Sequence, residues 1–324
     1  MSVLSFRRRE ARLDQVEEAS SFQAAVLHGL SQRKKSIPAR FFYDKRGSEL
    51  FEQITALDEY YPTRAELSIL STYGEEIAAA AADARALVEF GAGSTRKIRL
   101  ILNAMPFLEV YAPIDISGEF LGEEARQLAE DYPRLRIVPV VADFMGPVSL
   151  PEDVLQRRRL AFFPGSTIGN FVPREGLHLL ERMRQLIGSG GAALIGVDLK
   201  KDVDTLLAAY DDAEGVTAAF NLNLLQRANR ELGANFDSGA FAHEVRYNEG
   251  RGCIEMHLRS LRAQTVRIGA VSFTFTEDET IHTEDSHKFT MAEFRLLARA
   301  SGLEPAASWV DAEQRFSVHL LRYG

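Results

Sequence analysis

The sequence has little cysteine, no long apolar run and no excess of basic residues. Its 324 residues contain a single cysteine, Cys253, which excludes an internal disulfide and a four-thiolate zinc site and suits a reducing cytoplasm. Lys and Arg number 38 against 46 Asp and Glu, a net charge of −8, so we predict no nucleic-acid partner. The longest apolar stretches, such as 100–108 and 192–197, are far shorter than the roughly 20 residues that span a bilayer, so no membrane association is predicted.

The N-terminus also lacks the apolar segment of a secretory signal. Its basic cluster, within MSVLSFRRRE, leads into a polar and acidic stretch, so no signal peptide is predicted. Apolar residues make up 46% and charged residues 26% of the chain, which is typical of a globular protein with a sizeable core. The length allows one large domain or two modest ones. The sequence does not specify the oligomeric state, and a monomer is compatible with it.

Short apolar runs alternate with helical patterns through the middle of the chain. The runs lie at 86–90, 110–116, 137–141, 160–163 and 192–197. This alternation predicts an α/β fold with a mostly parallel sheet that is covered on both faces. Capping-box patterns at 63–66 and 290–293 predict two helix starts, and segments 308–310 and 316–321 are expected to rejoin the sheet as closing strands.

The periodicity changes in two places outside this strand series. Residues 200–235 carry apolar side chains at mostly three- and four-residue intervals, which predicts helices, whereas 253–288 alternate with a period of two, which predicts antiparallel strands. The first 60 residues also fall outside the series. We therefore predict a discontinuous arrangement: a sheet domain of residues 63–200 and 288–324, and a second α+β domain, a lid for substrate recognition, of residues 1–62 and 201–287.

Polar or glycine residues follow three successive strands of the predicted sheet. The first ends in Glu89-Phe-Gly91-Ala-Gly93, where glycines let a ligand approach the backbone. A lone G-x-G is weak evidence, because glycine-rich turns are common. Arg96 stands where a dinucleotide site would carry its third glycine, which disfavours NAD and FAD.

The next two strand ends add acceptors and a ring. Asp115 is placed to accept the hydroxyl protons of a ribose, although a strand-end cap is the alternative. Asp143 and Phe144 would meet the amino edge and the face of an adenine. The three strand ends together are similar to those of S-adenosylmethionine-dependent methyltransferases, so we expect S-adenosylmethionine as the cosubstrate and no metal.

A glycine-rich segment, Phe163-Pro-Gly-Ser-Thr-Ile-Gly-Asn-Phe, follows the fourth strand. Its Asn170 either caps the next helix or donates to a substrate carboxylate. With this segment, and with Arg40-Phe-Phe-Tyr-Asp, Glu59-Tyr-Tyr-Pro-Thr-Arg-Ala-Glu, Ala208-Ala-Tyr-Asp-Asp and Thr283-Glu-Asp-Ser-His-Lys-Phe, the chain resembles the histidine-specific N-alpha-methyltransferases of ergothioneine biosynthesis from about residue 20 to its end.

This resemblance implies a Rossmann-like class I methyltransferase sheet and trimethylation of the α-amino group of L-histidine to hercynine. The implied cofactor-binding residues are Glu89, Gly91, Gly93, Lys97, Asp115, Asp143 and Phe144. The implied substrate-binding residues are Tyr60, Gly165, Asn170, Tyr210, Met256, Glu284 and Ser286. Asn170 and Tyr210 would hold the carboxylate, Glu284 and Ser286 the imidazole, and Tyr43 the amine; all three of Tyr43, Asn170 and Tyr210 are expected to act in catalysis.

Each role has a structural alternative. The two tyrosines at 60 and 210 could be core aromatics, Met256 a core filler and Glu284 a solvated strand charge. A metal site at 282–287 is disfavoured, because strand alternation sends His282 and Glu284 to one side and Asp285 and His287 to the other. The alternative functions are N-methylation of another aromatic amino acid such as tryptophan, or of a related metabolite, and, from a different class, a nucleotide-binding regulator or a dinucleotide oxidoreductase.

Overall fold

The computed structural model describes residues 21–93, 95–116 and 118–324. The basic cluster on which the signal-peptide prediction depends lies outside the described residues. The chain divides into two compact units, one of Pro62–Lys200 with His287–Gly324 and one of Met1–Tyr61 with Lys201–Ser286. We call them the sheet unit and the second unit. That the second unit recognises the substrate stays a prediction.

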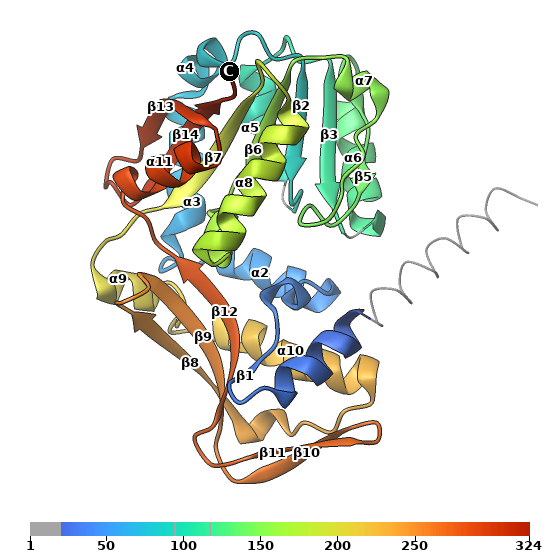
Figure 1. Ribbon diagram of the computed structural model, residues 1–324, viewed down its shortest axis with the longest axis vertical. Helices are drawn as coiled ribbons and strands as arrows, with labels where there is room; N and C mark the ends of the chain where they lie inside the picture. The colour runs from blue at the N-terminus through green and yellow to red at the C-terminus, as the bar shows by residue number, and fades with distance from the viewer. Residues whose placement is uncertain (1–20, 94, 117) are drawn as a thin grey trace, which may run out of the picture. The chain divides into compact units, whose positions relative to one another are not determined.

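The sheet unit contains the predicted mostly parallel sheet (Figure 1). Its strand order is β13-β14-β7-β6-β2-β3-β4, and β5 also pairs with β3. The strands from β7 to β5 are parallel, whereas β14 runs antiparallel to β7 and β13 antiparallel to β14. Their bounds are β2 Ala86–Phe90, β3 Val110–Asp115, β4 Arg136–Ile137, β5 Val140–Val141, β6 Arg159–Phe163, β7 Ala192–Asp198, β13 Glu304–Val310 and β14 Phe316–Arg322. The predicted α/β class and the return of the final strands to the sheet are confirmed.

One predicted strand is wrong in detail. The run at 137–141 forms two separate two-residue strands, β4 and β5, with Pro139 between them. Proline has no backbone N–H to donate to the ladder, so the pairing with β3 is interrupted there.

Helices cover both faces of this sheet. One face packs against α3 (Tyr61–Thr72), α4 (Gly74–Ala80), α5 (Thr95–Ala104) and α6 (Gly118–Asp131). The other packs against α7 (Glu152–Leu155), α8 (Pro173–Ile187) and α11 (Met291–Ala300). Neighbouring strand residues alternate between the two layers, as Leu87 and Val88 do, because successive side chains on a strand point to opposite faces.

The two predicted capping boxes have different outcomes. Thr290 caps α11, and its side chain and that of Glu293 make the reciprocal backbone hydrogen bonds. The box predicted at Thr63 is wrong, because α3 already begins at Tyr61 and places Thr63 inside the helix. Glu66 is consequently not a capping residue, and its side chain is fully buried.

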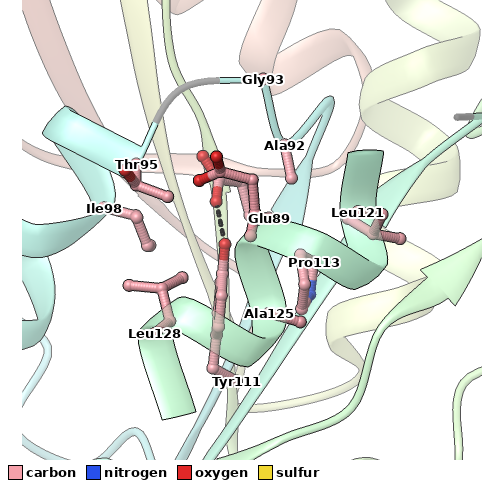
Figure 2. A pocket seen from close by; sticks show the side chains of 11 residues that line it. Glu89, Ala92, Gly93, Thr95, Ile98, Tyr111, Pro113, Leu121, Ala125 and Leu128 are labelled. Carbon is pink, nitrogen blue, oxygen red and sulfur yellow. Dashed lines mark hydrogen bonds between the residues drawn. The ribbon is translucent and has the colours of Figure 1, made fainter. Parts of the chain in front are cut away.

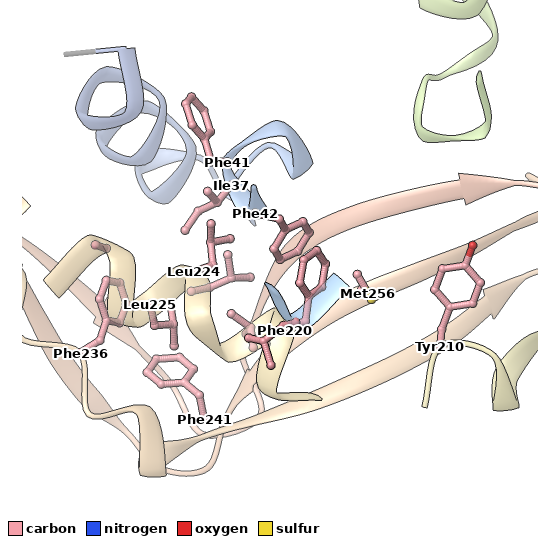
Figure 3. Close-up of a cluster of buried hydrophobic side chains, with 14 of the residues drawn as sticks. Ile37, Phe41, Phe42, Tyr210, Phe220, Leu224, Leu225, Phe236, Phe241 and Met256 are labelled. Atoms are coloured by element: carbon pink, nitrogen blue, oxygen red, sulfur yellow. The ribbon is translucent and has the colours of Figure 1, made fainter. Parts of the chain in front are cut away.

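The second unit combines a four-stranded sheet of order β1-β12-β9-β8, a ribbon of β10 and β11, and helices. The strands are β1 Lys35–Ser36, β8 Phe241–Asn248, β9 Cys253–Ser260, β10 Gln264–Ile268, β11 Val271–Phe275 and β12 Thr280–His287. The helices are η1 Ala39–Phe42, α2 Lys45–Ala56, α9 Val203–Ala208, α10 Val216–Leu232 and η3 Ser238–Ala240, besides helical residues at 21–31. Figure 3 shows part of the apolar core that these elements share. None of the described helices has the length and hydropathy of a membrane span.

Candidate active site

The glycine turn after β2 leaves its backbone open. Gly91 has a positive φ of 73°, which favours glycine, and its amide donates to the carbonyl of Ile114 at 2.9 Å. Among the described residues other than its chain neighbours, none has an atom within 4 Å of a Cβ built on Gly93. A ligand can therefore approach this turn, although Ser94 of the motif lies outside the described residues.

Glu89 points into the layer between the sheet and helices α5 and α6. It lines a small cavity of about 10 Å³ beneath the glycine turn, and the Tyr111 hydroxyl donates to its carboxyl group (Figure 2). Burial raises the pKa of Glu89 to about 8 and the pKa of Tyr111 well above its usual value. The pair is therefore neutral over most of the physiological range, and the proton on Glu89 is available as a hydrogen-bond donor.

The other two strand ends lie on the same edge of the parallel sheet. Asp115 ends β3 and pairs in register with Val141, just before Asp143. The Asp143 carboxylate accepts the amide of Met145 at 2.8 Å, so it orders its own turn. The Phe144 ring lies 3.6 Å from where a Cβ on Gly91 would stand. The structure thus brings the glycine turn and the predicted adenine-contacting ring together.

Lys97 makes a buried ion pair that the sequence did not indicate. Its Nζ lies 2.6 Å from Oε2 of Glu66, whose side chain is 0% exposed. The same carboxylate oxygen accepts the backbone amide of Gly165 at 2.8 Å. Glu66 therefore joins three segments: α3, the first turn of α5 and the loop after β6. The sequence analysis assigned Glu66 to a capping box and therefore missed this role. A carboxylate among the apolar residues of α3 was the feature that could have indicated it.

The loop after β6 is tightly constrained. Ser166 adopts a left-handed φ of 57°, and its hydroxyl accepts the amide of Asp198 at 2.9 Å. Asn170 ends the 3₁₀ helix η2 (Thr167–Asn170) and does not cap α8, whose N-cap residue is Val172. The capping alternative for Asn170 is therefore excluded. The left-handed backbone of Ser166 is a conformation that, in residues other than glycine, is concentrated at functional sites.

In the second unit, the predicted substrate residues Tyr60, Tyr210 and Ser286 lie together. The hydroxyls of Tyr210 and Ser286 are 2.7 Å apart, and the ring centroids of Tyr60 and Tyr210 are 6.3 Å apart. All three are buried. Tyr43 is half-exposed and packs edge-on against Phe51, whose ring is in turn 6.2 Å from that of Tyr60. A continuous set of aromatic rings thus connects Tyr43 to the buried tyrosine pair.

Glu284 and Met256 are also buried. Glu284 is 8% exposed, so it is not a solvated strand charge. Met256 is 2% exposed and packs in the apolar core of the second unit, as its alternative interpretation predicted. Whether its side chain also forms a pocket wall stays a prediction.

The side-chain alternation predicted for β12 is wrong at one point. Nε2 of His282 lies 3.0 Å from Oδ1 of Asp285, a contact between positions three apart that a flat strand forbids. Pairing of β12 with β1 ends at His282, so the strand is supported on that side only up to this residue. Potential metal-binding atoms of Cys253, Glu255 and Asp285 lie within 4.8 Å of one another, but the Arg251 guanidinium pairs with both carboxylates and already supplies the positive charge there.

Comparison with known proteins assigns the chain, with the strand-end residues and the buried tyrosine pair described above, to a family. Residues 22–323 match the model of a family described as histidine-specific methyltransferase, SAM-dependent. The chain belongs to this methyltransferase family.

Among its relatives, histidine N-alpha-methyltransferase of Mycolicibacterium smegmatis is 40% identical over 93% of this chain and 95% of that protein. Histidine N-alpha-methyltransferase of Mycobacterium tuberculosis is 41% identical over 91% of this chain and 92% of its own. Ergothioneine biosynthesis protein 1 of Neurospora crassa is 29% identical over 89% of this chain but only 33% of its own length.

Membership of the histidine-specific methyltransferases covers both units, because the matched segment includes all the described strands of each. The match confirms the predicted methyltransferase class and its S-adenosylmethionine dependence. The individual roles of the site residues stay predictions.

Proposed function

We propose that this chain transfers methyl groups from S-adenosylmethionine to the α-amino nitrogen of L-histidine, ending at the trimethylated betaine hercynine, as a step of ergothioneine biosynthesis. The observation that carries the proposal is the family match over residues 22–323. Two histidine N-alpha-methyltransferases, 40% and 41% identical to this chain and matched over nearly their whole length, support it. A reducing compartment for this reaction stays predicted from the single cysteine.

The sheet unit fits an adenosyl sulfonium with an amino-acid tail. Open backbone at Gly93 and the ring of Phe144 beside Gly91 suit the nucleoside, and Asp115 stands at the neighbouring strand end as the proposed ribose acceptor. Lys97 is the proposed partner of the cofactor carboxylate. S-adenosylmethionine supplies an electrophilic methyl group on a sulfur that leaves without needing a proton.

The burden on the protein is therefore to position the amine. We propose that Asn170 and Tyr210 donate to the histidine carboxylate, while Glu284 and Ser286 bind the two nitrogens of the imidazole. With both ends held, the amine has one position, and near-attack placement of reacting atoms, about 3 to 3.5 Å apart, is a major source of rate enhancement. The burial of Glu284 favours the assignment, because a carboxylate withdrawn from water gains most by accepting a ring N–H.

Tyr43 is the proposed amine-positioning residue. The attacking nitrogen must be neutral, so its proton leaves to water or through a polar group before each transfer. After the third transfer the nitrogen has no lone pair, which ends the reaction at the betaine. The aromatic rings that connect Tyr43 to Tyr60 would tolerate the resulting fixed cation.

The alternative substrate, another aromatic amino acid such as tryptophan, is less favoured. An indole would gain from an apolar wall, whereas the site strand carries the buried Glu284 and the Ser286 hydroxyl.

The deciding experiment is mass spectrometry of histidine, tryptophan and the other amino acids incubated with the enzyme and S-adenosylmethionine. We expect mass increases of one, two and three methyl groups on histidine alone. Unmodified histidine with a methylated competitor would refute the histidine assignment. Calorimetric binding of NAD in place of S-adenosylmethionine would refute the methyltransferase activity itself.

A further inference from the structure

We propose that His243 is a positioning residue for the amino-acid site, which holds Tyr210 by its backbone and ties it, through Asn221 and Thr283, to the strand that carries Ser286. The inference rests on the proposed function, because it assumes that Tyr210 and β12 bind the substrate. His243 lies on β8, a strand that the sequence did not predict.

A line of hydrogen bonds connects these residues. Nε2 of His243 lies 2.8 Å from the carbonyl oxygen of Tyr210, and Nδ1 of His243 lies 2.8 Å from Nδ2 of Asn221. The Thr283 hydroxyl lies 2.9 Å from Oδ1 of Asn221 and 3.0 Å from the carbonyl oxygen of Met256, so these two acceptors share its one proton. The four residues come from β8, the segment after α9, α10 and β12, so the line crosses the unit from one strand to another.

The contacts of Asn221 determine the imidazole tautomer. Its Nδ2 also lies 3.0 Å from the carbonyl oxygen of His257, so that atom must be the donor and not the amide oxygen. Nδ2 therefore donates to Nδ1 of His243 as well, and Nδ1 carries a lone pair. The Tyr210 carbonyl only accepts, so the single ring proton resides on Nε2.

A charged imidazolium does not fit this arrangement. Protonation would place an N–H at Nδ1 directly against the N–H of Asn221 and break that hydrogen bond. Burial also lowers the pKa of His243, against the opposing effects of the Tyr210 carbonyl and of the charges on Asp211, Asp212 and Glu244. The register partner of His243 on β9 is the uncharged Leu258. The hydrogen-bond geometry and the lowered pKa both favour the neutral imidazole.

The line closes into a ring through the substrate residues. The Tyr210 hydroxyl contacts Ser286 on β12, and the same strand receives the other end of the line at Thr283. Tyr210 is therefore fixed at two points, its hydroxyl and its carbonyl, to elements that are anchored on β12. In Figure 3 the Tyr210 side chain lies at one end of the drawn cluster, beyond Met256. The closed set of hydrogen bonds therefore holds Tyr210 in addition to the apolar packing there.

Three substitutions separate the two contacts of the imidazole. In His243→Gln the amide nitrogen can take the place of Nε2 and keep the Tyr210 carbonyl bound. In His243→Asn the amide oxygen can take the place of Nδ1 and keep only the Asn221 contact, and His243→Phe removes both. Gln264→Leu is the control, because it deletes a partly buried polar group of the same unit that donates to Ser260 and Ala240 and has no contact with the line.

We expect the KM for histidine to rise by up to about tenfold in His243→Asn, which loses the partly buried hydrogen bond to the Tyr210 carbonyl. The rise should be at least as large in His243→Phe, which loses both hydrogen bonds, and distinctly smaller in His243→Gln. The Kd of S-adenosylmethionine and the activity of Gln264→Leu should stay within about twofold of the wild-type values, a range far below the loss of one hydrogen bond. In the wild type, ¹⁵N NMR should show the Nε2–H tautomer of His243.

An unchanged histidine KM in His243→Asn, or a Gln variant as impaired as the Asn variant, would overturn the proposal. So would an Nδ1–H tautomer, which is measured on the wild type and does not depend on whether His243→Phe folds. Failure of the wild type to methylate histidine would instead refute the proposed function, so the two failures are distinguishable.

Discussion

Glu66→Gln removes the charge of the buried carboxylate while preserving its shape. In the native chain this side chain has no exposed surface and compensates Lys97, which is 14% exposed. The glutamine oxygen can still accept the amide of Gly165, so the loop after β6 keeps its hydrogen bond. What the substitution removes is the negative charge opposite the Lys97 ammonium.

Removing one partner of a buried ion pair costs about 3 to 5 kcal/mol, because the other charge remains poorly solvated. Since Lys97 retains some exposure, we expect a loss near the lower end, about 3 kcal/mol in the free energy of unfolding. The matched control is Asp131→Asn, which breaks the ion pair with Arg99 in the same layer of helices. That pair has an equal 2.6 Å separation but side chains that are 30% and 47% exposed, so its loss should cost less than about 1 kcal/mol.

Urea denaturation measures these costs, and the double substitution Glu66→Gln with Lys97→Met tests their origin. Once both charges are gone, no unpaired charge remains, so the double variant should be more stable than either single variant. Its affinity for S-adenosylmethionine should nevertheless stay as low as that of Lys97→Met, if Lys97 binds the cofactor carboxylate. Equal losses in Glu66→Gln and Asp131→Asn, or simple additivity in the double variant, would refute the burial argument.

Three further outcomes are expected. Glu284→Ala should raise the KM for histidine at least about tenfold with little change in the Kd of S-adenosylmethionine, because a lost hydrogen bond to a charged group costs about 1.5 to 3 kcal/mol; unchanged histidine kinetics would remove its ring-binding role. Gly196→Ala should unfold the protein at lower urea, because the new Cβ would lie 2.0 Å from Oε1 of the buried Glu66; a wild-type midpoint would show that this carboxylate moves freely. Burial lowers the pKa of His319 to about 3, so between pH 6.5 and pH 3 the unfolded chain binds a proton that the folded chain does not. Stability should therefore fall with decreasing pH across that range, by up to about 1.4 kcal/mol per unit from this residue, and His319→Gln should lose that part of the slope in urea titrations at several pH values.

Predictions from the local sequence pattern were confirmed where the structure depends on residues that are contiguous or a few positions apart. The buried run at 86–90 became β2 with the predicted bounds, and Thr290 with Glu293 formed the predicted capping box. The capping box predicted at Thr63 failed because α3 already begins at Tyr61. Glu66 has the spacing of a capping residue, but Lys97 and Gly165 bind it instead. No residue beside Glu66 in sequence indicates either partner.

The sequence by itself determined the class of the fold, the family and the types of residue available for methyl transfer, because these depend on periodicity and on motifs contiguous along the chain. Only the tertiary structure decided which polar groups lose contact with water and which partners then compensate them. Glu66 with Lys97, and His243 with Asn221 and Tyr210, meet across long stretches of chain. Such pairings follow from how helices and strands pack, since the cost of burying an unpaired polar group is set by the neighbours that folding brings to it.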